Sequence, residues 1–167
     1  MTKLAEAVDR DPLAKSRLRL WLKLLKSTNH IEARLREKLK AEFGTTLPRF
    51  DVMSALSRFP DGLKMSQLSG VLKVSNGNVT GIVDRLVDDG FVARSPVPGD
   101  RRAWRVSLTS RGLKEFERQA IAHVGWVDEL LVAISSSDAE KMMTDLDSVT
   151  AQIGDGILDL SLEKESS

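Results

Sequence analysis

The chain has 167 residues, of which 41% are hydrophobic, a formal net charge of +1 and no cysteine. This length suits one substantial core, and the absence of cysteine excludes disulfides, thiolate catalysis and thiol-based redox sensing. No apolar run approaches the roughly 18 residues of a membrane span, and the N-terminus lacks a signal-peptide core. We therefore expect a cytoplasmic protein without a cofactor, and with only His30 and His123 available the sequence disfavours a structural zinc site.

The charges are segregated along the chain although they nearly cancel overall. Residues 10–40 hold ten basic side chains against three acidic ones, whereas residues 128–167 hold ten acidic side chains against two basic ones. A nearly neutral chain can thus present a basic surface to an anion. Solvated helix faces of opposite sign would give the same pattern.

The predicted elements are mostly helical. Apolar positions at spacings of three, four and seven predict the helices, while glycine and proline mark the boundaries between elements. After an N-terminal arm we expect helices over 13–43, 48–58, 65–72, 76–89, 110–134 and 138–160, and strands over 91–95 and 103–108. Ser137 and Glu140 have the spacing of a capping box for the last helix.

The stretch VSNGNVTGIVDRLVDDGFV, residues 74–92, predicts a helix with two different faces. Val79, Ile82, Val83 and Leu86 follow the i, i+3, i+4, i+7 rule and form a buried stripe. The opposite face and its flanks are small, polar or charged: Gly77, Asn78, Thr80, Gly81, Asp84, Arg85 and Asp88. Because glycine lacks Cβ and asparagine, threonine and arginine can read base edges, this face suits a DNA major groove. A helix–helix contact through small residues is the alternative.

The neighbouring segments favour the DNA interpretation. Residues 65–72, a turn at 73–75 and the helix that follows have the layout of a helix-turn-helix, with Ser75 as the N-cap. The next hairpin carries Arg94, Arg101, Arg102 and Arg105 around Pro98-Gly99. A basic hairpin after a recognition helix is typical of a wing that reaches phosphates or the minor groove, although a solvated hairpin can also be arginine-rich.

The stretch DGFVARSPVPGDRRAWRVSLTSRG resembles the wing signature of the MarR family of transcriptional regulators. That signature runs from a glycine and an apolar pair, through an arginine and Asp-x-Arg, to Leu-Thr-x-x-Gly. Here the matching positions are Gly90, Phe91, Val92, Arg94, Asp100, Arg102, Leu108, Thr109 and Gly112. VSNGNVTGIVDRL resembles the recognition helix of the same family, and the likeness spans about residues 20–150.

The resemblance implies a homodimer whose two winged helices occupy successive major grooves of a pseudo-palindromic operator. In that architecture Asp100 braces the wing while Arg102, with Arg101, enters the minor groove. The candidate DNA-binding residues are Ser75, Asn76, Gly77, Asn78, Thr80, Gly81, Arg85, Arg94, Asp100, Arg101 and Arg102.

The C-terminal helix offers separate support for a dimer. Met142, Leu146, Val149, Ile153, Ile157 and Leu160 recur at spacings of three and four and form one apolar stripe. A partner subunit would bury this stripe, and packing within one subunit is the alternative. A dimer on paired half-sites would also bind DNA more tightly than one DNA-binding module alone.

Family members usually bind a small, often aromatic ligand between the dimerisation region and the winged helix, which weakens DNA binding. The segments RLWL, TTLPRFDVM and NGNVTGIVDRL resemble a branch that represses aromatic-acid catabolism, some of whose members respond to acyl-CoA thioesters such as p-coumaroyl-CoA. The basic first helix is compatible with CoA phosphates. The candidate ligand-binding residues are Trp21, His30, Arg34, Arg36, Arg49, Phe50 and Trp126. For each of these, a role in the core, in the dimer interface or in attracting DNA is the alternative.

The sequence thus predicts a mainly α winged helix-turn-helix with long N- and C-terminal dimerisation helices and one two-stranded β-wing. Residues 1–47 would form the arm and dimerisation helix, 48–109 the DNA-binding region, and 110–167 the connecting and C-terminal dimerisation helices. A ligand-responsive repressor is the preferred function; a repressor sensing a free phenolic acid and a non-regulatory architectural DNA binder are the rivals. An enzyme is rejected because no catalytic motif is present.

Overall fold

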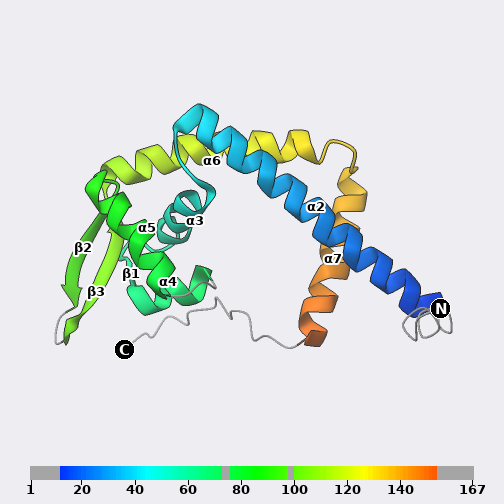
Figure 1. The fold of residues 1–167 in the computed structure, drawn as a ribbon, viewed down its shortest axis with the longest axis horizontal. Helices are drawn as coiled ribbons and strands as arrows, with labels where there is room; N and C mark the ends of the chain where they lie inside the picture. The colour runs from blue at the N-terminus through cyan, green and yellow to red at the C-terminus, as the bar shows by residue number, and fades with distance from the viewer. Residues whose placement is uncertain (1–11, 73–75, 98–99, 154–167) are drawn as a thin grey trace. The chain divides into compact units, whose positions relative to one another are not determined.

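One long helix dominates the first of two compact units, Met1–Phe50 and Asp51–Ser167. The computed structural model describes residues 12–72, 76–97 and 100–153. Helix α2 (Pro12–Phe43; Figure 1) matches the helix predicted over 13–43. It buries Leu35 and Leu39. It ends at Gly44, whose φ of 61° is the left-handed conformation that glycine adopts without strain. The predicted N-terminal arm lies outside the described residues.

The second unit contains the helix-turn-helix and its core. Helix α3 (Leu47–Ser57) leads into it, and α4 (Met65–Leu72) and α5 (Asn76–Asp88) follow, within a residue of the predicted bounds. The apolar core gathers side chains from α3, α4, α5 and the sheet: Val52, Met53, Ala55, Leu56, Leu63, Leu68, Val79, Val83, Leu86, Val92 and Val106. The predicted N-cap Ser75 and the turn at 73–75 lie outside the described residues.

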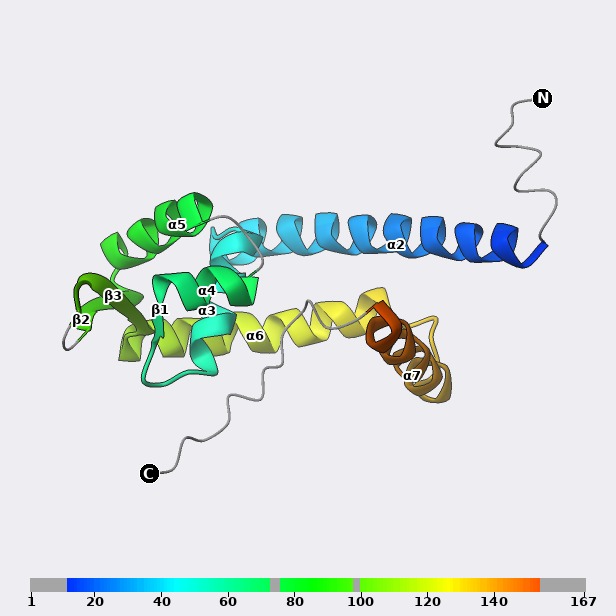
Figure 2. The same ribbon diagram turned by 90° about the horizontal axis from the view of Figure 1, so that it is seen from below.

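The sheet has three strands, one more than the sequence predicts. Strands β2 (Val92–Val97) and β3 (Asp100–Leu108) form the predicted hairpin, and β1 (Leu63–Lys64) pairs antiparallel with β3 in the order β1-β3-β2. The two residues of β1 are too few to show the alternation that marks a strand. They follow a turn closed by a 2.8 Å hydrogen bond from Gly62 N to Phe59 O. Figure 2 shows the β2–β3 hairpin beside α5.

Helix α6 (Ser110–Leu130) is shorter than the helix predicted over 110–134. It begins at the N-cap Thr109, whose Oγ1 accepts a hydrogen bond from Gly112 N. A turn follows α6, and α7 (Ser136–Ile153) then begins two residues earlier than predicted. The predicted cap Ser137 is wrong: Ser135 Oγ accepts from Asp138 N at 3.2 Å and donates to the Asp138 carboxylate at 2.6 Å. Serine hydroxyls compete for nearby backbone groups, and Ser135 is the one placed to cap this helix.

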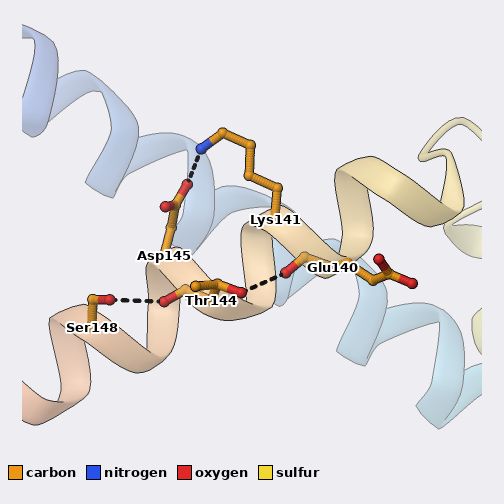
Figure 3. Close-up of polar contacts among 5 residues, drawn as sticks. All are labelled: Glu140, Lys141, Thr144, Asp145 and Ser148. Atoms are coloured by element: carbon orange, nitrogen blue, oxygen red, sulfur yellow. Dashed lines mark hydrogen bonds and ion pairs between the residues drawn. The ribbon is translucent and has the colours of Figure 1, made fainter.

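Helix α7 buries none of its described side chains. Met142, Leu146 and Val149 of the predicted apolar stripe are all exposed, at 42%, 44% and 51%. Several of its polar side chains have partners within the helix: Thr144 and Ser148 each donate to the carbonyl four residues before, and Lys141 pairs with Asp145 at 2.7 Å (Figure 3). The Asp145 carboxylate raises the pKa of Lys141 through this hydrogen bond and its charge. The stripe positions Ile157 and Leu160 lie outside the described residues.

Two substitutions on α6 test how closely this helix packs against Phe91, the residue that precedes β2. A Cβ at Gly112 would lie 1.9 Å from Phe91 O, whereas a Cβ at Gly125 would meet nothing within 4 Å. We expect Gly112→Ala to lower the free energy of unfolding by about 3 kcal/mol because backbone must move. Gly125→Ala should raise it by ~0.5–1 kcal/mol through helix propensity. Urea unfolding at one protein concentration measures both, and equal stability of the two variants would contradict this packing.

Candidate nucleic-acid interface

The outward face of α5 is bare near its N-terminus. Gly77, Asn78, Thr80, Gly81 and Arg85 are all exposed. A Cβ added at Gly77 or Gly81 would meet nothing within 4 Å, so neither glycine is required by packing inside the described chain. Asn76 opens the helix, and its side chain lies outside the described set.

The opposite face of α5 fixes which residues point outward. Val79, Val83 and Leu86 are each 0% exposed, as the i, i+4, i+7 spacing predicts, and Ile82 is partly buried. These side chains anchor the helix to the core, so the rotation of α5 about its axis is set by apolar packing. The first turn carries no acidic side chain, so no carboxylate of this turn offsets the positive end of the helix dipole.

The wing is built on an antiparallel ladder that runs from Val92↔Leu108 to Val97↔Asp100, with an irregularity between Pro96 and Val97. This ladder places Asp100, Arg101 and Arg102 at the start of β3, beside the tip. The side chains of these three residues lie outside those that the structure describes, as do residues 98–99. Their predicted contacts with DNA therefore remain predictions.

Arg94 contacts helix α5. Its Nη2 lies 2.5 Å from Asp84 Oδ1, and the two side chains are 31% and 48% exposed. This ion pair joins β2 of the wing to α5. Arg105 makes a second link, donating from Nη1 to the carbonyl of Asp61 at 3.1 Å. Two of the wing arginines thus hold the hairpin to the rest of the unit.

Trp104 is a wing residue that the sequence reasoning missed. It pairs with Pro96 across the ladder and is 49% exposed. By strand alternation it shares a face with Val106, which is fully buried, but it lies two residues nearer the tip. A large aromatic side chain beyond the edge of the core is the signal that could have identified it from the sequence.

The candidate ligand residues lie in both units and differ in exposure. Trp21 and His30 on α2 are exposed, with Trp21 at 56% and the His30 Nδ1 2.7 Å from Lys26 O. Phe50 is 7% exposed, Arg49 is half-buried, and Trp126 on α6 is 5% exposed.

The two α2 arginines have partners on their own helix. Arg34 donates to Glu37 at 2.9 Å, and Arg36 pairs with Glu32. Part of the positive charge counted along this helix is therefore neutralised locally.

Two kinds of feature are absent from the described residues. No helix among them is long and apolar enough to cross a membrane. Within the same ranges, no three His, Asp or Glu side chains cluster in a way that could hold a metal ion.

Comparison with known proteins connects this geometry to a family. The family model described as MarR family matches residues 45–104, which contain α4, α5 and most of the wing. The chain is 34% identical to the transcriptional activatory protein BadR of Rhodopseudomonas palustris, over 70% of this chain and 69% of that protein. It is 28% identical to the HTH-type transcriptional regulator PecS of Dickeya dadantii, over 61% of this chain and 63% of PecS, less than two thirds of that relative.

A solved structure extends the match. The crystal structure of a MarR family transcriptional regulator from Silicibacter pomeroyi is 36% identical, covers 86% of this chain and 99% of its own, and superposes with a TM-score of 0.73. The mainly helical winged-helix fold predicted from the sequence is thereby confirmed, with the third strand added. On the strength of these matches, the chain belongs to the MarR family.

Proposed function

We propose that this protein is a homodimeric, ligand-responsive transcriptional regulator that inserts α5 into the DNA major groove. The outward face of α5 carries the proposal: Gly77 and Gly81 have open space where side chains would be, beside exposed Asn78, Thr80 and Arg85. Amide, hydroxyl and guanidinium groups match the donors and acceptors of base edges, and missing Cβ atoms allow close approach. Ser75 precedes the helix and Asn76 begins it, and both would contact the DNA backbone beside the groove.

The wing would supply the second set of DNA contacts. Arg101 and Arg102 would reach the minor groove beside the major groove that α5 occupies, with Asp100 bracing the wing. Arg94, paired with Asp84, would hold the hairpin at a fixed distance from α5 and leave only part of its charge for phosphate. Fixed spacing between a recognition helix and a wing is what allows both to be engaged at once.

Exposed apolar side chains support a dimer. Large apolar side chains at helical spacing are each at least 42% exposed in the single chain: Leu18, Leu22 and Leu25 on α2, and Met142, Leu146 and Val149 on α7. Monomeric proteins rarely leave such large side chains in rows on a helix. A second copy would bury them and place two α5 helices on one pseudo-palindromic site.

We assign the effector contacts to Trp21, His30, Arg34, Arg36, Arg49, Phe50 and Trp126, and the effector to the aromatic acyl-CoA thioesters, with p-coumaroyl-CoA as the first candidate. Phosphates of CoA would bind cations, and an aromatic acyl group would stack on indole or phenyl rings. A free phenolic acid is the alternative effector, and an architectural role is the alternative to regulation. The name of BadR describes an activatory protein, so both repression and activation of an aromatic-catabolic operon fit the proposal.

Replacing Gly81 tests the close approach of α5 to DNA. Gly81→Leu should abolish binding to a duplex selected by this protein from random sequences, because the new side chain would hold the helix out of the groove. Gly81→Ala is the matched control; its single methyl group should reduce affinity far less. Both variants should remain folded, since a Cβ at this position meets nothing within 4 Å. Fluorescence anisotropy measures affinity, and full DNA binding by folded Gly81→Leu would contradict the orientation of α5. Equal affinity for selected and random duplexes in the unchanged protein would favour the architectural role.

Replacing Arg102 tests the wing. If this side chain contacts a phosphate, Arg102→Ala should weaken DNA binding and reduce the slope of log K against log salt by about 0.9, since one fewer counterion is released. A titration at several salt concentrations measures the slope. Lys40→Ala, a loss of the same charge in the last turn of α2, serves as the control. Equal affinity and equal slope in Arg102→Ala and the unchanged protein would remove Arg102 from the interface.

Titration with p-coumaroyl-CoA, free p-coumarate and plain CoA tests the effector class. Calorimetry reports binding, and release of the selected duplex reports regulation. The thioester is expected to bind most tightly and to weaken DNA binding, because it alone carries both the aromatic and the phosphate groups. Tight binding of the free acid alone would establish the alternative effector. If none of the three compounds bound or released the duplex, the acyl-CoA assignment would be contradicted.

A further inference from the structure

A surface cavity lies at the base of the wing, and none of the residues that line it is among those assigned above to DNA or effector. Its lining comes from the entrance to β2 and the first turns of α6: Phe91, Ser110, Arg111, Lys114, Glu115 and Arg118. The cavity volume is about 460 Å³, within the range of about 300–1,000 Å³ typical of small-molecule sites.

The cavity wall has an excess of positive charge. Arg111, Lys114 and Arg118 lie at i, i+3 and i+7 on α6, and therefore on one face of the helix. Glu115 is the single acidic side chain of the lining. It accepts from Arg118 Nη1 at 2.8 Å and from Gln119 Nε2 at 3.0 Å, so its charge is directed to those neighbours.

Two of these cations lack an anionic partner among the described residues. Lys114 makes no ion pair or hydrogen bond there, and the contact of Arg111 is with an aromatic ring: its guanidinium carbon lies 5.0 Å from the centroid of Phe91. Like charges at such spacings on a helix repel each other by about 0.2–0.5 kcal/mol per pair. They also oppose the positive end of the α6 dipole, whose first turn carries no acidic residue. An anion would relieve both unfavourable effects.

We propose that this cavity binds a small organic oxyanion, a carboxylate or phosphate carried on a compact group. Arg111 and Lys114 would hold the oxyanion through charge-assisted hydrogen bonds, and the Ser110 hydroxyl would donate a further one. The Arg111 guanidinium lies over the Phe91 ring, and an aromatic or planar group of the ligand would pack beside this pair. The binding does not depend on the proposed DNA contacts.

Nuclear magnetic resonance titration of the full chain tests the proposal with inorganic phosphate, phenylphosphate and phenol at constant ionic strength. Backbone amides of Phe91, Ser110 and Arg111 should shift and saturate with both phosphates. Tighter binding of phenylphosphate would place its ring against Phe91, and equal binding would assign the affinity to the oxyanion alone. Saturable shifts with phenol but with neither phosphate would overturn the proposal.

Charge variants separate a specific site from general screening. Arg111→Gln and Lys114→Gln should each weaken binding of phosphate by about fivefold or more, as expected for loss of one charge-assisted contact. Lys40→Gln, with the same change of net charge on α2, should leave the affinity unchanged. Equal weakening in all three variants would mean nonspecific attraction and would contradict the site. Loss of DNA affinity in the α6 variants, with no small-anion binding by the unchanged protein, would assign the patch to DNA phosphates instead.

Discussion

The winged helix depends on one polar joint, where the residues that connect α5 to β2 meet the first turn of α6. Thr109 N donates to Phe91 O at 3.0 Å, and Thr109 Oγ1 lies 2.8 Å from Gly90 O and accepts from Gly112 N at 2.9 Å. The α6 backbone at Gly112 packs so closely on Phe91 that no Cβ fits between them. One threonine therefore links α6 to the connection between α5 and β2. Because polar groups at a part-buried junction are costly to leave unpaired, these hydrogen bonds stabilise the joint.

The joint also explains why part of the site could be predicted from the sequence. Leu108, Thr109 and Gly112 belong to the segment whose resemblance suggested the family, and the structure gives each a physical role in capping or close packing. The buried stripe of α5 was predictable for a similar reason. Val79, Val83 and Leu86 follow a helical period, and periodicity is a local property of the sequence.

The features that could not be predicted depend on residues distant in the chain or on very short segments. The partner of Arg94 is Asp84, on a different element, and no spacing rule relates a strand residue to a helix residue ten positions earlier. Strand β1 owes its existence to pairing with β3 and not to its own two residues. The charge of α2 was counted residue by residue, but Arg34 and Arg36 are each paired with a glutamate on the same helix. A count of basic residues therefore overstates the positive potential of α2, because glutamates on the same helix neutralise part of the charge.

The energetics of α5 show why its outer face is free to match a partner. Gly77 and Gly81 together cost at most about 2 kcal/mol of helix stability relative to alanine. Burial of Val79, Val83 and Leu86, all at 0% exposure, contributes about 1.5–3 kcal/mol for each side chain. Burial of the three side chains is thus larger than the cost of the two glycines, so the buried face can offset the loss of helix propensity on the exposed face. The exposed face of α5 carries glycines although they lower helix stability. A partner surface that must approach the α5 backbone closely, such as the proposed DNA groove, best explains them.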